Sequence, residues 1–382
     1  MHTYKLEQCC MGGGKGMQTQ KRKKLVNGTA VVLSLAIAVL SAVCVGARLP
    51  SALGGETTRL QLMAAGLTMP DGTVKQQENP TAPVVSTIAD ADQARKTEST
   101  GNSEKEETVP RKKDSDGHEG ERTFPVIESQ YGASGVEYDN FSIRNTTDYV
   151  INVGQQLQLP LGFEMENTAK PQVLVVHTHT GEAYMQEDLG YYYENYNGRD
   201  TDDNYNVTRV GAAIVDTLNA HGIGALHSTT HHDDPSYNGS YDRSAETIYS
   251  YLEEYPTIKV VIDLHRDAIG YGGESGKIKP TFVANGKKAA QIMIMSGYDP
   301  TGAYGFSHWE YNLRFALRLQ QTAETLYPGM TRPLYFGDFA YNMSINTGSL
   351  LIEVGTDVNT LDEAVYSGEL LGEVLAQVLK SA

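Results

Sequence analysis

Apolar runs of strand length alternate with segments of helical periodicity from about residue 124 to the C-terminus. The runs VLVV, GALHS, KVVID, PTFVA, QIMIMSG and SLLIEVG have the length and aliphatic content of buried strands. Between them, NVTRVGAAIVDTLNAHG, YDRSAETIYSYLEEY, WEYNLRFALRLQQTAETLY and LDEAVYSGELLGEVLAQVL carry apolar residues at helical spacing. This alternation predicts an α/β domain over residues 124–382, with a mostly parallel or mixed central sheet covered by helices on both faces.

The N-terminal third has a different pattern. An uncharged apolar stretch at 25–47, LVNGTAVVLSLAIAVLSAVCVGA, follows the basic cluster KRKK and is long enough to cross about 30 Å of hydrocarbon as a helix. A cleaved signal peptide is the competing interpretation, but its apolar core is usually shorter, about 7–15 residues. We therefore predict a retained single-pass anchor, with residues 1–24 forming a cytoplasmic tail and everything after Arg48 outside the membrane.

Residues 48–123 are poor in aromatic residues and rich in Thr, Ser, Gly, Gln and mixed charge. Such a segment cannot bury enough apolar surface to offset its ordering entropy, so we predict a disordered extracytoplasmic linker. All three cysteines precede it, so the exported part has no disulfide framework. The net charge of −16 argues against a nucleic-acid partner.

Three of the predicted strands end on reactive side chains. VLVV leads into His177 and His179, KVVID into His265, and SLLI into Glu353. Ligands bind beyond the carboxyl ends of parallel strands, so these side chains are expected to meet at one edge of the sheet. A hydrogen-bonded polar strand end is the simpler interpretation of any one of them, but the three together favour a shared site. Two imidazoles with a carboxylate suit Zn²⁺, and a further carboxylate could act as the base on a bound water.

Other polar residues close to these strand ends are candidates for the same site. Either Glu182 or His177 could supply a third ligand. Asp263 could orient an imidazole as an outer partner, although we expect it to face elsewhere. Arg266 and Asp267, which directly follow the second strand end, are candidate substrate contacts.

The segment HHDDPSYNGSYDRS is predicted to be a loop, because it contains Pro, Asn and Gly. A polar surface loop leading into a helix explains much of it. Its aromatic and amide side chains also suit a rim that binds saccharide or peptide, which makes Tyr237, Asn238 and Tyr241 candidate substrate contacts. His231 and His232 are alternative metal ligands, although adjacent residues rarely both point into one site.

Several of these motifs occur together and in order: HTHTGEAY, NYNVTRVG, HHDDPSYNGSYDRSAETI, VVIDLHRDA and LLIEVGTDVNTLDEA. In this respect the chain, from Phe124 to its C-terminus, resembles the stage II sporulation protein P family. Members of that family are membrane-anchored peptidoglycan hydrolases of endospore-forming bacteria, and the anchor and linker predicted above agree with this resemblance.

The resemblance implies a zinc-dependent N-acetylmuramoyl-L-alanine amidase with an additional endopeptidase activity on stem peptides. It also implies a role in septal wall thinning and engulfment, at the mother-cell septal and engulfing membrane. The implied partners are peptidoglycan, stage II sporulation protein D (a lytic transglycosylase) and stage II sporulation protein M. The implied fold is similar to that of the type-3 zinc amidases, a phosphorylase/hydrolase-like α/β fold.

The resemblance to the type-3 amidases also suggests roles for individual residues. Their two ligand histidines correspond to His179 and His265, and their catalytic glutamate corresponds to Glu353. The arginine of their substrate-side loop corresponds to Arg243, which would help to stabilise the oxyanion.

One departure concerns the ligand glutamate that begins the next helix in those amidases. Here the region reads NYNVTR, with Asn204 or Asn206 in that place, so the third contact falls to Glu182 or His177. Two other functions stay open on sequence alone: a zinc peptidase that cuts stem peptides only, and a non-enzymatic septal scaffold that binds glycan.

Overall fold

The computed structural model describes residues 112–382. The predicted tail, the predicted anchor at 25–47 and most of the predicted linker lie outside the described residues. From residue 112 onwards, no helix is both long and apolar enough to cross a membrane. The last part of the predicted linker is described and contacts the domain: Lys112 pairs with Asp200, and Asp114 Oδ2 accepts a hydrogen bond from the backbone of Glu187 at 2.8 Å.

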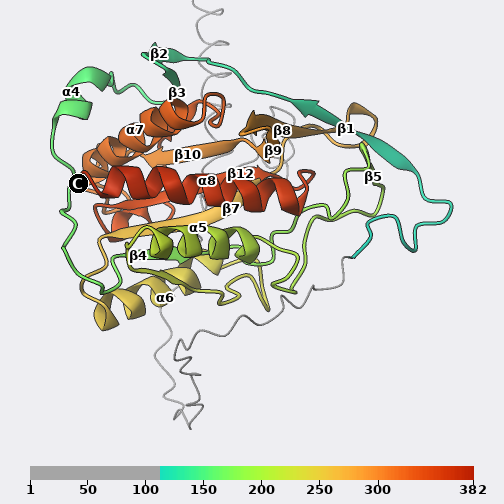
Figure 1. Ribbon diagram of the computed structural model, residues 1–382, viewed down its shortest axis with the longest axis horizontal. Helices are drawn as coiled ribbons and strands as arrows, with labels where there is room; N and C mark the ends of the chain where they lie inside the picture. Colours follow the sequence, from blue (N-terminus) through green and yellow to red (C-terminus); the bar gives the residue numbers. More distant parts are fainter. Residues whose placement is uncertain (1–111) are drawn as a thin grey trace, which may run out of the picture. The chain divides into compact units, whose positions relative to one another are not determined.

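The central sheet has eight strands and is mixed (Figure 1). In spatial order they are β2 (Val136–Tyr138), β3 (Phe141–Asn145), β11 (Leu334–Gly337), β10 (Ile292–Gly297), β12 (Ser349–Thr356), β7 (Val260–Asp267), β4 (Val173–Val176) and β6 (Ala225–His227). The strands β12, β7, β4 and β6 run parallel, whereas β10 is antiparallel to β12. The predicted α/β class with a mixed sheet is therefore confirmed.

A second, four-stranded sheet was not expected from the pattern. Its order is β5 (Tyr191–Tyr193), β1 (Thr123–Ser129), β8 (Lys277–Ala284) and β9 (Lys287–Ala290). The run PTFVA was correctly predicted as a strand, but it belongs to this sheet. Strand β1 is mostly exposed, so its sequence lacks the continuous apolar signal of the central strands.

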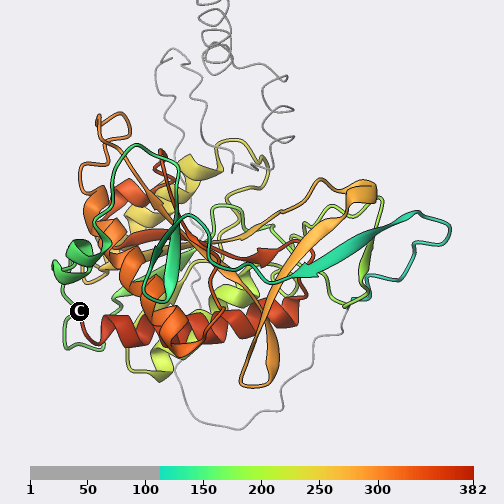
Figure 2. The ribbon, with the colours of Figure 1, turned by 90° about the horizontal axis from the view of Figure 1, so that it is seen from above.

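Helices cover both faces of the central sheet. The helices are α4 (Val153–Gln158), α5 (Thr208–Ala220), α6 (Ser240–Glu254), α7 (Trp309–Leu326) and α8 (Leu361–Leu379), with 3₁₀ turns at Gly273–Ser275 and Met343–Ile345. Leu174 and Val176 of β4 pack against Ile248 of α6, whereas Val173 and Val175 point to the opposite face and join the core shared with α5, α7 and α8. Figure 2 shows α6 and α8 on opposite sides of the sheet.

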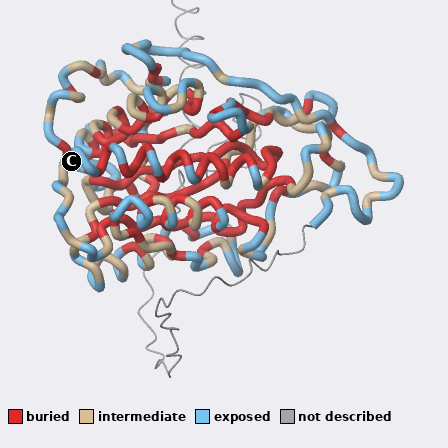
Figure 3. The backbone as a smooth tube through the Cα atoms, viewed as in Figure 1, coloured by how far each residue is buried: buried red, intermediate tan, exposed pale blue. Residues whose placement is uncertain are grey.

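The strands that deliver the candidate residues are the most deeply buried part of the fold (Figure 3). Two of them continue beyond the predicted strand ends: β7 runs on to Asp267 and β12 to Thr356. Glu353 pairs in register with His265, and a bulge follows it. Gly355 takes a φ of +62° in this bulge, and a Cβ there would lie 2.6 Å from Asn359 Oδ1. Glu353 and His265 are thus fixed side by side by backbone pairing.

Candidate active site

His265 lies at the centre of the cluster, between two carboxylates. Its side chain is 1% exposed, and its Nδ1 is 3.4 Å from Glu182 Oε2. On the other side, Nε2 is 3.0 Å from Asp263 Oδ1, although the contact lacks the alignment of a hydrogen bond. Asp263 is two residues before His265 on β7, so both side chains project from the same face. Burial alone would lower the pKa of His265, but Asp263 and Glu182 hold it well above its ordinary value.

Both carboxylates are fixed by backbone donors. Glu182 Oε2 accepts a hydrogen bond from the Arg266 amide at 3.0 Å, and Asp263 Oδ1 accepts one from the Thr178 amide at 2.9 Å. The Thr178 hydroxyl donates to Asp263 Oδ2 at 2.7 Å. Burial alone would raise the pKa of each carboxyl, but the neighbouring His265 lowers both; the charge of Arg266 also lowers the pKa of Glu182, and the bonds from Thr178 also lower that of Asp263. Glu182 and Asp263 are therefore anionic at neutral pH.

His179 is buried without a hydrogen bond at either ring nitrogen. Its ring stacks on Tyr237 with centroids 4.1 Å apart, and it lies edge-on to His265 at 5.3 Å. Burial is the main cause that lowers the pKa of His179 to about 4. The imidazole is therefore neutral at physiological pH, which is the form that binds metals. Buried polar atoms are rarely left unpaired, so two free nitrogens on one buried ring indicate a missing partner.

Glu353 completes the cluster beside His265. Its side chain is buried, and Oε2 has no hydrogen-bond partner. Burial and then the negative charge of Asp267 raise the pKa of Glu353 to about 8, although His265 acts in the opposite direction. A carboxyl with a raised pKa in a buried cluster is typical of a general base or acid.

The raised pKa of Glu353 predicts how stability depends on pH. Between the ordinary pKa of 4.5 and the folded value of about 8, the folded protein holds a proton that the unfolded chain has released. The free energy of unfolding of the metal-free protein should therefore fall as the pH rises through this window, by an amount on the order of a few kcal/mol. Glu353→Gln should remove that part of the fall. Urea unfolding at pH 5, 6.5 and 8 tests this, and equal pH slopes for the two proteins would contradict it.

The donor set fits zinc in part. In a tetrahedral site with metal–ligand distances of about 2.0–2.2 Å, two ligand atoms lie about 3.3–3.6 Å apart. The 3.4 Å between His265 Nδ1 and Glu182 Oε2 agrees with this spacing, and Asp263 stands where an outer carboxylate supports a ligand histidine. Within residues 112–382, however, no three His, Cys, Asp or Glu side chains are already arranged to hold a metal ion. The residues thus fit zinc in donor type and in the spacing of one pair, and His179 would have to adjust to join them.

His177 is directed away from this cluster. Its Nδ1 is 3.0 Å from the Leu264 carbonyl oxygen and its Nε2 is 2.8 Å from His227 Nε2, so both nitrogens are used. Both imidazoles fit against Gly211 of α5, where a Cβ would lie 2.5 Å from His227 Nε2. Burial lowers the pKa of His177 to about 3. Of the two residues proposed for a third contact, only Glu182 lies beside His265.

The loop after β6 contributes Tyr237 to the cluster, and several of its other polar groups form hydrogen bonds within the fold. Arg243 Nε donates to the His232 carbonyl at 2.6 Å, and its terminal nitrogens donate to the carbonyls of Ser236 and Asn238. His231 pairs with Asp203 at 2.8 Å, and both nitrogens of His232 are bonded within the fold. In this conformation the guanidinium of Arg243 therefore holds the loop together.

Of the remaining predicted substrate contacts, Tyr241 borders the cluster, whereas Arg266 and Asp267 are bonded to other parts of the fold. Tyr241 lies edge-on to His179 at 5.6 Å, and its hydroxyl is buried without a partner. Arg266 is buried and donates to the carbonyls of Ala183 and Gly198, at 3.1 and 2.6 Å. It therefore supports the loops that carry these two carbonyls. Asp267 pairs with Arg332 at 2.8 Å.

Two features of the site were harder to find from sequence. We expected Asp263 to face away from the imidazoles, but its Oδ1 lies 3.0 Å from His265 Nε2. Nothing in the sequence marked Thr178 as the group that holds Asp263. Arg332 lies in the connection between α7 and β11, outside every motif.

Asn206, in the place of a ligand glutamate, is buried and accepts a hydrogen bond from the Thr208 amide at 2.9 Å, so it supports the start of α5 instead.

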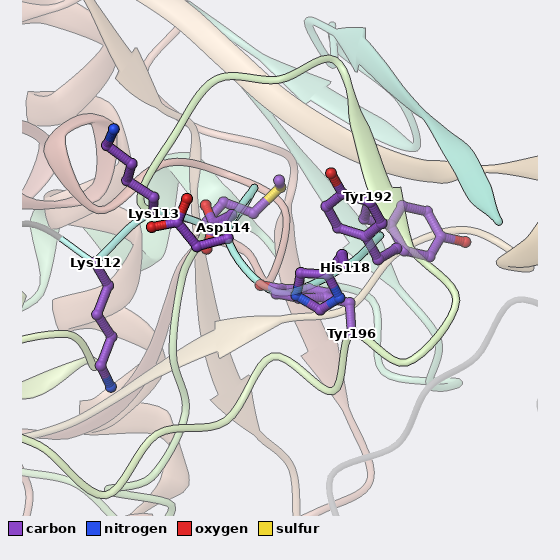
Figure 4. Close-up of a pocket in the computed structure, with 9 residues that line it drawn as sticks. Lys112, Lys113, Asp114, His118, Tyr192 and Tyr196 are labelled. Atoms are coloured by element: carbon purple, nitrogen blue, oxygen red, sulfur yellow. The ribbon is translucent and has the colours of Figure 1, made fainter. Parts of the chain in front are cut away.

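A separate cavity of about 380 Å³ lies between the first described residues and the tyrosine-rich loop. It is lined by Lys112, Lys113, Asp114, Asp116, His118, Met185, Tyr192, Tyr193 and Tyr196. Figure 4 shows the two lysines and Asp114 on one side, and His118, Tyr192 and Tyr196 on the other. The His118 ring stacks on Tyr193 at 4.2 Å, and no residue of the histidine cluster lines this cavity.

Comparison with known families gives a match over most of the chain. Residues 52–376 match the family described as stage II sporulation protein P. The curated stage II sporulation protein P of Bacillus subtilis (strain 168) is 26% identical over 220 residues, which cover 55% of this chain and 51% of that protein. The chain thus aligns with about half the length of this curated relative.

Several solved structures are similar at low identity. An N-acetylmuramoyl-L-alanine amidase from Clostridium difficile 630 is 18% identical, with a TM-score of 0.33, and the match covers 56% of this chain and 97% of that one. The amidase Ami1 from Mycobacterium abscessus, in its apo form, is 16% identical with a TM-score of 0.33, covering 56% and 98%. The amidase AmiC2 of Nostoc punctiforme is 14% identical with a TM-score of 0.30, covering 55% and 96%.

Proposed function

Because the chain belongs to the stage II sporulation protein P family, we propose that it is a peptidoglycan hydrolase of sporulation, a zinc-dependent N-acetylmuramoyl-L-alanine amidase. The bond to be cleaved is the amide between the lactyl group of muramic acid and L-alanine, so that stem peptides leave the glycan. A further endopeptidase activity on the stem peptides is part of the proposal.

One observation carries this proposal. At a single edge of the sheet, the unpaired nitrogens of His179 and the unpaired Oε2 of Glu353 lie next to the pair formed by His265 and Glu182. A purely structural core would pair these atoms, because each unmet buried polar group costs about 1–3 kcal/mol. The cluster therefore supports a catalytic site better than it supports a scaffold that only binds glycan.

The residues would act as follows. His179, His265 and Glu182 would hold Zn²⁺, which when bound supplies a Lewis acid that polarises the scissile carbonyl and acidifies water. Glu353 would take a proton from the attacking water and deliver it to the leaving nitrogen of L-alanine. The positive charge of a bound metal ion would lower the pKa of Glu353 from about 8, which favours the basic form at neutral pH.

Product analysis tests the proposed reaction. The full-length chain is incubated with purified sacculi, with added zinc or with a chelator, and the products are identified by mass spectrometry. Stem peptides with a free L-alanine amino group, released only with zinc, are the expected products. Products cut only within the stem peptides would indicate the zinc peptidase, and no products at all would indicate the scaffold.

Asp263→Asn is expected to weaken zinc binding by about 10–100-fold, because the outer carboxylate that fixes the ligand His265 is lost. The amide oxygen can still accept the bond from the Thr178 backbone, and the amide nitrogen can donate to the Thr178 hydroxyl, so the fold should hold. Competition with a chromophoric chelator measures the affinity without relying on activity. Asp299→Asn is the matched control, since Asp299 is also buried but caps the backbone amides of Tyr304 and Phe306. Equal affinities for the two variants would contradict this role of Asp263.

The cellular setting is also part of the proposal. Residues 25–47 would anchor the chain in the cell membrane, with residues 1–24 in the cytoplasm and the domain outside. In sporulating cells this places the enzyme at the mother-cell septal and engulfing membrane. Stage II sporulation proteins D and M are the proposed partners there.

A further inference from the structure

Arg332 is a buried arginine at the edge of the sheet where the catalytic cluster lies. It is 6% exposed, and its backbone amide donates to the carbonyl of Ile292, at the first residue of β10. Because β10 pairs antiparallel with β12, that residue lies level with Val354, next to Glu353. Arg332 also bonds Asp267, two residues after His265, through Nη1 at 2.8 Å. The guanidinium is thus attached to the strand edge that carries the catalytic residues.

Two of the donor groups of Arg332 have no partner. Nε and Nη2 are both buried and form no hydrogen bond, whereas Nη1 is used by Asp267. Leaving buried donors unpaired costs free energy, and a guanidinium cannot avoid that cost by releasing its proton and becoming neutral. Nε and Nη2 form one edge of the planar fork, the edge that matches the two oxygens of a carboxylate. A free edge of this kind is complementary to an anion that is bound side-on.

The other buried arginine near the cluster shows what a structural role looks like. Arg266 uses Nε and Nη2 to bind backbone carbonyls, and none of its nitrogens is left buried and unpaired. The same holds for Arg243, which binds three carbonyls of its own loop. Among residues 112–382, Arg332 is the arginine whose buried donors lack an acceptor.

We propose that Arg332 binds a carboxylate on the peptide part of the substrate through Nε and Nη2. The inference rests on the proposed function, which places an acidic peptide at this edge. A singly charged carboxylate suits the surroundings better than a phosphate dianion, because Asp267 and Glu182 already concentrate negative charge nearby. The Cζ atom of Arg332 lies 6.0 Å from the centroid of the Tyr131 ring. Because Nε and Nη2 are buried, neighbouring side chains have to move when the ligand enters.

Binding of two matched ligands tests this assignment. The probes are N-acetylmuramoyl-L-alanyl-D-glutamate and the same compound with both glutamate carboxylates converted to amides. Calorimetry uses the full-length chain with Glu353→Gln, so that neither probe is hydrolysed. This parent protein should bind the diacid about 10–100-fold more tightly than the diamide. Adding Arg332→Gln should abolish the preference by weakening only the diacid, and Arg332→Lys should keep part of it.

The contrary results are equally specific. A parent protein that binds the two probes equally, or does not bind the diacid, overturns the assignment without any change at Arg332. If Arg332→Gln or Arg332→Lys weakens both probes by the same factor, Arg332 has only a structural role. The readout is binding and not cleavage, so it is separate from the amidase proposal. That proposal fails independently if the protein with Glu353 intact releases no stem peptides.

Discussion

Replacing Glu353 with Gln is expected to slow the release of stem peptides from sacculi by about 10²–10⁴-fold, the usual contribution of a general base. Gln keeps the shape of the side chain but cannot accept a proton. The register of β12 with β7 fixes residue 353 beside His265 through backbone bonds, which the substitution does not touch. Binding to sacculi should therefore survive while turnover is lost.

The measurement is the rate at which L-alanine amino groups appear in purified peptidoglycan. Glu363→Gln is a matched control, since Glu363 is also buried but bonds the backbone of Thr360 in the capping box of α8. It should lower stability by about 1–3 kcal/mol, because Glu363 also pairs with the buried Lys279 at 2.9 Å, and leave the rate per folded molecule unchanged. Release by the Glu353→Gln protein at the rate of the unaltered protein would show that Glu353 is not the base.

His179 and His177 are expected to respond in opposite ways to replacement by Ala. His179→Ala should abolish hydrolysis. It should also weaken zinc binding by more than about 10–100-fold, which is the effect of losing a residue that only supports a ligand. Its ring nitrogens bond nothing in the metal-free protein, so no hydrogen bond is lost. His177→Ala should retain zinc but destabilise the fold by about 2–4 kcal/mol, because it removes two buried hydrogen bonds and leaves a cavity against α5.

The two histidines are two residues apart, which makes the pair a stringent comparison. Chelator competition gives the zinc affinity of each variant, and urea unfolding of the metal-free proteins gives the stability. If His177→Ala lost zinc and His179→Ala retained it, the assignment of the two imidazoles would have to be exchanged.

Much of the fold and part of the site could be predicted from the pattern of the chain. The four long helices and five of the eight central strands (β4, β6, β7, β10 and β12) were found because their apolar residues are continuous or spaced for one buried face, whereas β2, β3 and β11 were not predicted. The strand ends at His179, His265 and Glu353 do converge, because parallel strands bring their carboxyl ends to one edge. In the second sheet β8 was predicted from its apolar run, whereas β1 is exposed and β5 is short, so these two carry little apolar signal.

The individual contacts could not be predicted in the same way. Nothing in HTHTGEA shows that His177 turns toward His227 and α5 while His179 turns toward Tyr237, because this depends on how the turn after β4 is packed. Arg243 was the expected substrate arginine, yet loop carbonyls take its donors. Arg332 had no sequence signal, since its place beside Asp267 follows from the packing of a connecting segment.

The most direct test of the central claim is a crystal structure of the protein soaked with zinc, with the metal located by its anomalous scattering. One zinc ion is expected at the carboxyl edge of β4 and β7, within about 2.0–2.2 Å of nitrogens of His179 and His265 and an oxygen of Glu182. Glu353 should lie beside the ion without being a ligand. Zinc held elsewhere, for example between His231 and Asp203, with the His179 cluster empty, would contradict it.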